Sequence, residues 1–505
     1  MAAPHLSPYP TARLLMTAST SPSVLIIGSG FGGIAAAVEL QRHGHRDITI
    51  LEGSDGIGGT WHHNTYPGAA CDVPSSLYSF SFARGSGWSR FCAPQSEILA
   101  YLRRTATRFG VDRLVRLGQL VETCDWDAST QRWTATTATG ETFSAQVLII
   151  ATGQLHQPQT PALPGIESFA GHAFHSARWD HDLELAGKRI AVIGNGASAV
   201  QFVPEIAAEA ERLTVFQRTG NWFMSRENRP YSPMRKRIRA IPGVEAIERR
   251  GIYYYLEFIT LSIRHPRTVG KFLRSLSWLF MRAQLRGEPE LRKKLWPDYT
   301  FGCKRVLFTS HFLRALRRPN VDVETTSIAR IVPEGVMTAD GTVHEADTII
   351  YATGFRTTDF MLPMQITADG TSLSEAWSGG AAAHLGITVP GFPSLFLMYG
   401  PNTNTSGGSI LVFLEAQARY VRTALDHLRS TGAAAIEVDR AVADASDRSL
   451  QAEFDGTAWL GCDSWYRADG GRIVTNWPSS MQDYRARTRA IDPAEFVAVP
   501  AHATT

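Results

Sequence analysis

Two glycine-rich turns, each preceded by a short apolar run, are the stretches of this chain whose residue types and spacing could do chemistry. The first follows Val24–Ile27 and has glycine at Gly28, Gly30 and Gly33. In such a turn the first glycine permits a tight bend, the second lets the backbone approach a pyrophosphate, and the third lets the next helix pack on the strand. The helix N-terminus offers N–H groups and a positive dipole end to phosphate. The pattern therefore predicts dinucleotide binding.

An acidic residue supports this prediction. A helix is expected at about Phe31–His43 and a second strand at Ile48–Leu51, and Glu52 directly follows that strand. A carboxylate at the end of the second strand is placed to accept hydrogen bonds from a ribose diol. A glycine pattern alone is weak, but strand, helix, strand and terminal acid in register make a dinucleotide site much more specific.

The second turn has Gly194, Gly196 and Ala199 at the same spacing, after a strand expected at Arg189–Ile193. A helix at Ala197–Ala208 and a strand at Leu213–Phe216 are expected to follow. This fold is therefore a second dinucleotide-binding unit, in which Asn195 and Ser198 are candidates for further phosphate contacts.

At the position equivalent to Glu52, the second fold has Gln217, Arg218 and Thr219. A carboxylate there would repel a 2′-phosphate, whereas a guanidinium offers it two hydrogen bonds. We therefore predict NADPH rather than NADH, with Arg218 and Thr219 at the phosphate. The alternative is that Arg218 is a surface arginine after a strand.

The same three residues follow two of the expected strands, and this repeat indicates how the two folds are connected. Val147–Ile150 is followed by Ala-Thr-Gly, and so is Asp347–Tyr351, while residues 111–135 have the pattern of paired strands. Two such endings suggest that one fold is inserted in the other. The predicted class is α/β, with two doubly wound Rossmann-like domains and a helical insertion. The expected divisions are a flexible arm at 1–22, a first domain at 23–160 and 355–492, a second domain at 161–354, and a frayed tail at 493–505.

The helical insertion is expected at residues 222–300, where β-branched runs are few and Arg, Leu, Tyr and Trp are common. Val269–Leu285 has the periodicity of an amphipathic helix. We expect the aromatic residues of this insertion to belong to a core more readily than to anchor a membrane. Whether the insertion touches a membrane stays open.

Composition excludes several classes of function. The net charge is +3 over 505 residues, which gives nucleic-acid binding no support. No run reaches the roughly 18–20 apolar residues of a membrane helix. The five cysteines are scattered and form no C-x-x-C pair, so no zinc site or redox dithiol is expected, and a reducing cytoplasm is the predicted location. Nothing indicates the oligomeric state.

The residues Phe169–Asp180 lie between the two folds and have the spacing Phe-x-Gly-x-x-x-His-x-x-x-Trp-Asp. A second motif comprises Gly58–Trp61, Tyr66–Gly68 and Asp72. Together they resemble the type I Baeyer–Villiger monooxygenases, and the resemblance covers about residues 22–490. It implies FAD and NADPH as cofactors, and a ketone and dioxygen as reactants. The implied product is an ester or lactone, formed through a flavin peroxide.

The resemblance also implies roles for individual residues. Asp72 would be an active-site aspartate that orients Arg305, the catalytic arginine, and Lys304 would contact the nicotinamide nucleotide. The alternatives are a turn cap for Asp72 and a surface basic pair for Lys304 and Arg305. Val306–His311 lacks the family's usual aromatic pair, which leaves the pocket shape open. The implied contacts to FAD come from Gly59, Thr60, Trp61, Asp72, Tyr78, Val121 and Asn402.

Three other functions share features with this one. An N- or S-oxygenating flavin monooxygenase would use similar chemistry, but usually lacks the combination of Asp72 and Arg305. A disulfide reductase would need a suitably spaced dithiol, which the sequence does not offer. An NADPH- and FAD-binding redox protein without oxygenase turnover is the remaining alternative.

Overall fold

The first glycine turn lies at the centre of a five-stranded parallel sheet. The computed structural model describes residues 21–500 except residues 86, 227, 362, 406 and 469. All but two residues of the expected arm at 1–22 therefore lie outside the described residues. In spatial order the strands of this sheet are β20 (Leu395–Leu397), β7 (Val147–Ile150), β1 (Val24–Ile27), β2 (Ile48–Leu51) and β3 (Val115–Arg116).

The two faces of this sheet are covered by different layers, because side chains alternate along each strand. Ile26 and Ile50 pack under helices, whereas Leu25 and Leu51 pack on a second sheet. The helices are α1 (Phe31–Arg42), α3 (Gln95–Arg108) and α11 (Ile410–Thr431). The second sheet contains β19 (Thr371–Ser372), β18 (Gln365–Ala368), β4 (Val121–Asp127), β5 (Arg132–Thr137) and β6 (Thr142–Ala145).

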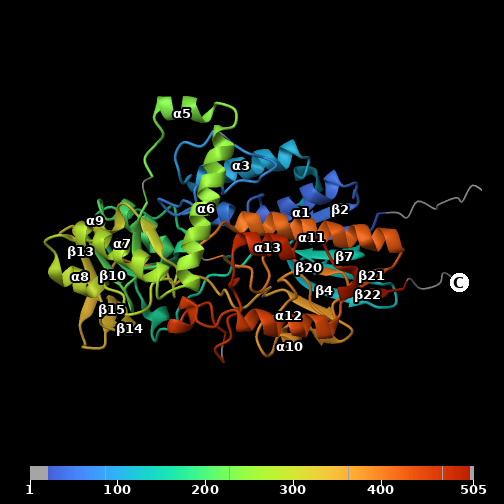
Figure 1. The fold of residues 1–505 in the computed structure, drawn as a ribbon. Coiled ribbons are helices and arrows are strands. Elements are labelled where there is room, and N and C mark those ends of the chain that lie inside the picture. Colours follow the sequence, from blue (N-terminus) through green and yellow to red (C-terminus); the bar gives the residue numbers. More distant parts are fainter. Residues whose placement is uncertain are drawn as a thin grey trace, which may run out of the picture.

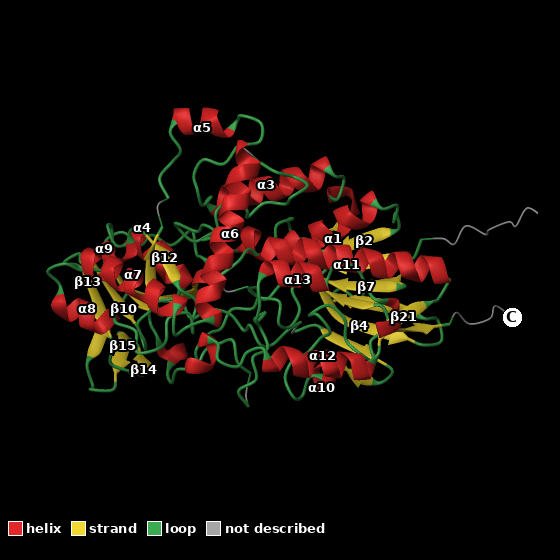
Figure 2. Cartoon of the chain, in the orientation of Figure 1, coloured by secondary structure: helices red, strands yellow, loops and turns green. Residues whose placement is uncertain are grey.

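The second glycine turn also follows a strand of a five-stranded parallel sheet, which confirms the predicted α/β fold class. Its parallel sheet contains β13 (Val321–Glu324), β10 (Arg212–Phe216), β9 (Arg189–Ile193), β17 (Thr348–Tyr351) and β8 (His172–His175). One face packs on α4 (Ala197–Ile206) and α9 (Phe312–Ala315). The other face packs on β14 (Ile328–Val332), β15 (Gly335–Thr338) and β16 (Val343–Glu345). Figure 2 shows the strands in two separate groups, flanked by helices.

The chain leaves the first sheet after β7 and returns to it in β18 and β20, which pair with β4 and β7. The outgoing and returning segments lie side by side, since Gln159 donates its N–H to the Gly354 carbonyl (2.9 Å) and Arg356 donates to that of Gln157 (3.0 Å). If one fold is inserted in the other, the outgoing and returning segments must lie next to each other, and these two hydrogen bonds join them. The domain boundaries themselves stay predictions.

The described residues of the insertion, 222–226 and 228–300, form four helices and one strand. These are β11 (Phe223–Ser225), α5 (Pro233–Arg239), α6 (Val244–Arg264), α7 (Val269–Gln284) and α8 (Pro289–Leu295), and β11 pairs with β12 (Leu307–Thr309). Figure 1 shows α5 and the adjoining end of α6 projecting from the body of the molecule. The expectation of a buried aromatic set is wrong in part, because Trp222 is buried but Tyr254 and Phe272 are exposed. No helix among the described residues is long and apolar enough to span a membrane.

The C-terminal part of the chain closes the first fold. Its elements are α10 (Leu373–Ala376), β21 (Ala435–Val438), α12 (Arg440–Ala452), α13 (Met481–Arg487) and β22 (Phe496–Val499). We expected fraying after Asp492, but β22 pairs antiparallel with β21 over four residues. The packing of these two strands explains why the tail is ordered. Ala435 of β21 is fully buried, and Val499 of β22 packs on the same core. Residues 501–505 lie outside the described residues.

We predict that the tail contributes to stability through this pairing. Deletion of residues 493–505 removes β22 and uncovers Ala435, so it should lower the melting temperature by several degrees. Deletion of residues 501–505 alone is the control and should leave the melting temperature unchanged. Differential scanning fluorimetry of both truncated proteins makes the measurement. Equal melting temperatures would mean that the pairing adds no stability.

Candidate active site

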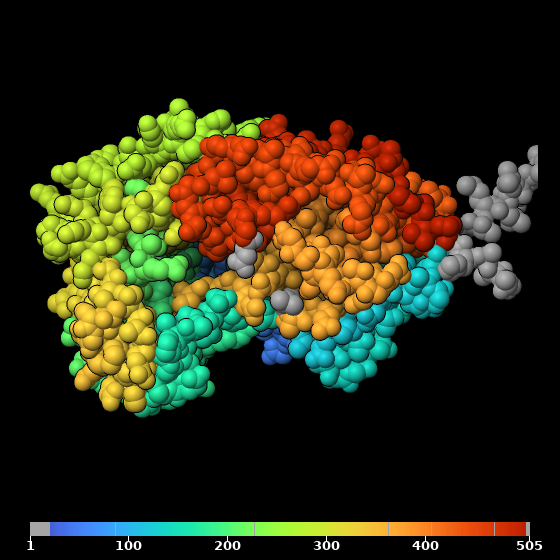
Figure 3. Space-filling view, turned by 90° about the horizontal axis from the view of Figure 1, so that it is seen from below, coloured from blue at the N-terminus to red at the C-terminus, as the bar shows by residue number. Residues whose placement is uncertain are grey.

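Both glycine turns open into one cavity of about 1410 Å³. This exceeds the roughly 300–1,000 Å³ of a site for one small ligand, so the cavity has room for more than one. Of the residues predicted to act, all line it except Gly33 and Asn402. Seen from below, the molecule has a hollow between the second fold, in green, and the returning part of the first, in orange (Figure 3).

The first turn is built from close backbone approaches that only glycine permits. Gly28 has φ +103°, and a Cβ there would lie 2.6 Å from the Ala151 carbonyl oxygen. A Cβ on Gly33 would lie 2.0 Å from the Gly28 carbonyl oxygen, so Gly33 acts by letting α1 pack against the turn. Gly30 and the first residues of α1 line the cavity, so the N-terminus of this helix faces it, which fits a pyrophosphate.

Glu52 lies where β2 ends and is almost fully buried. Its carboxylate accepts from the Ser29 N–H (2.9 Å), the Ser29 hydroxyl (2.7 Å) and the Ser54 N–H (3.0 Å). Burial alone would raise the pKa of Glu52, but these hydrogen bonds outweigh it and hold the pKa below its usual value. Glu52 is therefore a fixed anion on the cavity wall, as a ribose diol requires.

The remaining residues assigned to FAD surround this turn. Trp61 lies on α2 (Thr60–His63) and donates its indole N–H to the Tyr78 hydroxyl (3.1 Å). Val121 begins β4 at the cavity wall. Asn402 does not line the cavity. Its amide donates to the carbonyl groups of Ile473 (2.8 Å) and Asn476 (3.0 Å), so its side chain is committed to joining two loops.

The second turn has the same close backbone contact as the first turn has at Gly28. A Cβ on Gly194 would lie 2.4 Å from the Ala352 carbonyl oxygen. The Asn195 amide donates to the Gln217 side chain and to the Thr219 carbonyl, each at 2.9 Å. Asn195 thus holds the loop that carries Arg218, and its amide is used within the protein rather than offered to phosphate. Arg218 is exposed at the cavity wall, as a partner for a 2′-phosphate should be.

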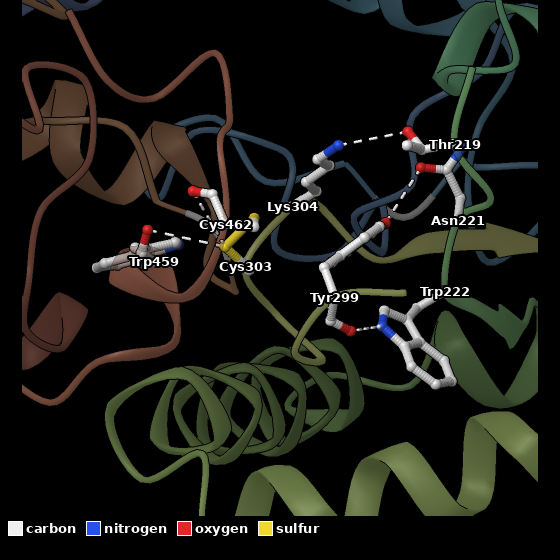
Figure 4. Close-up of a disulfide and its surroundings, with 8 residues drawn as sticks. All are labelled: Thr219, Asn221, Trp222, Tyr299, Cys303, Lys304, Trp459 and Cys462. Atoms are coloured by element: carbon white, nitrogen blue, oxygen red, sulfur yellow. Dashed lines mark hydrogen bonds between the residues drawn. A yellow bond between two sulfur atoms is a disulfide. The ribbon is translucent and has the colours of Figure 1, made fainter. Parts of the chain in front are cut away.

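Lys304 reaches the same loop from a distant part of the chain. Its ammonium group lies 3.3 Å from the Thr219 hydroxyl and 4.8 Å from the centre of the Tyr299 ring (Figure 4). Burial, and then the charge of Arg218, lower the pKa of Lys304. Asp298 and Asp463 offset part of this effect. Two cations that still repel each other at the cavity wall favour an anionic ligand.

Asp72 and Arg305 form a bidentate ion pair. Arg305 Nε donates to Asp72 Oδ2 (3.1 Å), and Arg305 Nη2 donates to both carboxylate oxygens (2.8 and 2.7 Å). The side chains are 32% and 21% exposed for Arg305 and Asp72. Burial opposes ionisation of Asp72, but Arg305 outweighs it and lowers the pKa of Asp72, while Asp72 raises the pKa of Arg305. Both groups therefore stay charged.

Sequence reasoning missed two residues that support this pair. Gln201 on α4 donates to the Ala70 carbonyl (2.9 Å) and accepts from the Ala70 N–H (3.1 Å). Arg226, which follows β11, donates to the Cys71 carbonyl (3.2 Å) and further lowers the pKa of Asp72. Neither belongs to a motif, and only the folded chain brings them to the loop before Asp72.

The motif Phe169–Asp180 lies outside the cavity wall. Its central residues form β8 at the edge of the second sheet, and Trp179 packs on Phe174 and Phe202. The His175 ring accepts the Ala177 N–H (3.1 Å) and packs against Phe355, in the segment that returns to the first fold. The motif therefore stabilises the junction of the two folds.

A disulfide that the sequence reasoning did not expect joins Cys303 to Cys462, 159 residues apart (Figure 4). Because it is present, the scattered cysteines no longer argue for a reducing compartment. Cys303 directly precedes Lys304 and Arg305, and Cys462 directly precedes the cavity-lining Asp463–Trp465. Cys71, Cys92 and Cys124 are free and buried.

Two dinucleotide turns that share one cavity define an oxidoreductase that works with two nucleotide cofactors. Residues 25–242 match the family model described as pyridine nucleotide-disulphide oxidoreductase. That match does not include Cys303 or Cys462, so it is no evidence of disulfide reduction by this pair.

Relatives of similar length identify the family. A Baeyer-Villiger monooxygenase from Streptomyces coelicolor is 41% identical over 94% of this chain and 92% of its own. One from Pseudomonas aeruginosa is 38% identical over 94% and 90%. A closed crystal structure of cyclohexanone monooxygenase matches 96% of this chain and 100% of its own, with a TM-score of 0.86 and 28% identity. A steroid monooxygenase bound to NADP matches 95% and 100%, with a TM-score of 0.84 and 29% identity.

The chain therefore belongs to the Baeyer–Villiger monooxygenases. It is an FAD-containing, NADPH-dependent enzyme that acts on a small molecule with dioxygen, and its cofactors are those that the sequence predicted.

We predict that Arg218 selects NADPH over NADH. Loss of a hydrogen bond to a charged group costs about 1.5–3 kcal/mol, so Arg218→Ala should lower kcat/KM for NADPH roughly 10- to 100-fold and leave NADH nearly unchanged. Steady-state oxidation of both nucleotides makes the measurement. Arg212→Ala is a matched control, because Arg212 is exposed on the preceding strand and pairs with Asp322 (2.8 Å). Equal losses with both nucleotides would refute the assignment.

We also predict that the disulfide positions the Lys304–Arg305 segment. Cys462→Ser should retain FAD but bind NADP⁺ several-fold more weakly, because the segment loses its covalent link to Asp463–Trp465. Titration of flavin absorbance with NADP⁺ measures the dissociation constant. Dithiothreitol should weaken binding in the unaltered protein and not in Cys462→Ser. Cys124→Ala, at a free cysteine, serves as control. Identical dissociation constants would contradict a positioning role.

Proposed function

We propose that the small-molecule substrate is a ketone, which the enzyme converts to an ester or lactone. The observation that carries this proposal is the bidentate pair of Asp72 and Arg305 on the wall of the cavity that residues of both glycine turns also line. An ionised guanidinium there is suited to negative charge that develops on reacting oxygen atoms.

Arg305 is proposed as the catalytic residue and Asp72 as its positioning partner. The carboxylate occupies Nε and Nη2 of the guanidinium and so fixes the plane of the group. Since Asp72 raises the pKa of Arg305, the guanidinium stays protonated and acts as a fixed cation rather than as an acid. Bound FAD supplies the activation of dioxygen and NADPH the reducing equivalents.

The other site residues are assigned to the cofactors. We propose that Gly28, Gly30 and Glu52 hold the pyrophosphate and ribose of FAD. Arg218, Thr219 and Lys304 would hold the phosphate of NADPH, because they form one cluster of positive charge and hydroxyl at the cavity wall. The remaining proposed contacts come from Gly59, Thr60, Trp61, Tyr78, Val121, Gly194, Gly196 and Ser198.

Oxygenation of three substrate classes tests the proposal. Cyclohexanone, an aryl ketone and a thioether are supplied separately with NADPH and dioxygen, and the products are identified by mass spectrometry. An ester or lactone from either ketone supports the proposal. A sulfoxide as the sole product would indicate an S-oxygenating enzyme, and NADPH oxidation without any oxygenated product would indicate a redox protein.

We predict that Arg305 is needed for oxygen transfer and not for the fold. Removal of one such donor typically costs about 10²–10³ in rate. Arg305→Ala should therefore bind FAD and oxidise some NADPH, yet divert most reducing equivalents to hydrogen peroxide. The measurement is ester formed per NADPH oxidised, with flavin content determined in the same sample.

Two further variants sharpen this experiment. Asp72→Ala should show a milder loss of coupling, because it leaves the cation in place and removes only its positioning. Arg282→Ala, at an exposed arginine of α7, should behave like the unaltered protein. Unchanged rate and coupling in Arg305→Ala would show that Arg305 has no part in the chemistry.

A further inference from the structure

Helices α5, α6 and α7 expose an unusual amount of apolar surface. Of the nineteen large apolar side chains that are exposed among the described residues, twelve belong to residues 233–284. Ile247 and Met234 are the two most exposed of the nineteen, at 75% and 72%. We call these twelve residues the α5–α7 face: Met234, Ile238, Ile241, Ile247, Tyr254, Tyr255, Phe258, Leu261, Phe272, Leu276, Trp278 and Leu279.

The face is fixed in place by the opposite sides of the same helices. On α6, Ile252, Leu256, Ile259 and Ile263 are buried. Arg249 Nη1 donates to the carbonyl groups of Ser76 (2.7 Å) and Ser79 (2.9 Å), and Ser76 donates to Glu248 (2.9 Å). The outward residues Ile247, Tyr254, Phe258 and Leu261 follow the three- and four-residue spacing of one helix face. The exposure of these side chains therefore follows from the way α6 packs on the rest of the molecule.

The exposed charges in the segment that carries this face have one sign. Nine lysines and arginines of residues 233–284 are exposed, and all three acids of the segment, Glu245, Glu248 and Glu257, are half-buried. The exposed basic residues are Arg235, Lys236, Arg237, Arg250, Arg264, Arg267, Lys271, Arg274 and Arg282. The whole chain carries only +3, so positive charge is concentrated in the same segment that exposes the apolar side chains.

We propose that the α5–α7 face binds the surface of a bilayer that contains anionic phospholipids. Aromatic and aliphatic side chains bury themselves at the boundary of headgroups and acyl chains, while lysine and arginine attract anionic headgroups. Tyr254, Tyr255 and Trp278 have the amphipathic rings that favour this interface. The end of the insertion that projects in Figure 1 carries Met234 and Ile247, and it would enter the headgroup region first.

A second copy of the chain fits this face less well. A two-fold symmetric contact would bring the same nine cations toward their equivalents with no exposed acid between them, and such like-charge contacts are unfavourable. A nucleic acid would match the charge but not the exposed aliphatic side chains. A bilayer matches both, and it is also where apolar ketones accumulate.

Sedimentation with lipid vesicles tests the proposal. The FAD-loaded protein is mixed with vesicles of phosphatidylcholine, with or without phosphatidylglycerol. It should sediment only with the anionic vesicles, and less as the salt concentration rises. Each cation near a membrane contributes about 1 kcal/mol, so the double variant Lys236→Glu and Arg237→Glu should bind at least about tenfold more weakly. Ile247→Glu should weaken binding through the apolar contact.

Controls separate the outcomes. Leu117→Glu changes an exposed leucine of the first fold, 45% exposed, and should bind vesicles normally. All variants should retain FAD and oxidise NADPH normally in the absence of vesicles. The proposal is overturned if anionic vesicles bind no protein at low salt, or if Leu117→Glu loses binding as Ile247→Glu does. It is also overturned if sedimentation velocity shows a dimer that Ile247→Glu dissociates.

Discussion

The ion pair between Asp72 and Arg305 links the placement of the two folds to the proposed catalytic residue. Asp72 belongs to a loop of the first fold, and Arg305 follows the insertion of the second. Each charge is partly withdrawn from water, which costs free energy that the other charge and its hydrogen bonds offset, with a further contribution from Arg226 at Asp72. The folds are therefore most stable in the arrangement that pairs the two residues, and that arrangement also places Arg305 on the cavity wall.

Neighbouring contacts make this arrangement more specific than one ion pair would. Gln201 binds both backbone groups of Ala70, and Arg226 binds the Cys71 carbonyl, so the second fold holds the two residues before Asp72 by hydrogen bonds. On the opposite side, Lys304 contacts Thr219, and the Cys303–Cys462 disulfide joins the same segment to the returning chain. Backbone hydrogen bonds, a side-chain contact and a covalent bond thus act on the four residues next to the proposed catalytic pair, which are Ala70, Cys71, Cys303 and Lys304.

Local pattern predicted the strands of both folds closely, and distance in sequence explains what it did not. Val24–Ile27, Ile48–Leu51 and Arg189–Ile193 form strands with the expected bounds, because buried parallel strands consist of continuous apolar runs. The disulfide, the strand β22 and the orientation of Asn402 depend on partners 58 to 159 residues away. No pattern within the chain specifies such pairings, so neither the order of the tail nor the inward hydrogen bonds of Asn402 can be predicted from the sequence.

The motif that identifies the family and the residues that line its cavity have separate tasks. His175 and Trp179 pack at the junction of the folds, whereas Arg218, Lys304 and Arg305 line the cavity. The insertion divides in the same way, since α6 buries one face against the first fold and exposes Tyr254 and Phe258 on the other. The inward face of α6 must pack against the fold, which limits the residues that can occupy it. The outward face has no such packing requirement. Its apolar and basic composition therefore calls for an explanation outside the fold, and a bilayer surface provides one.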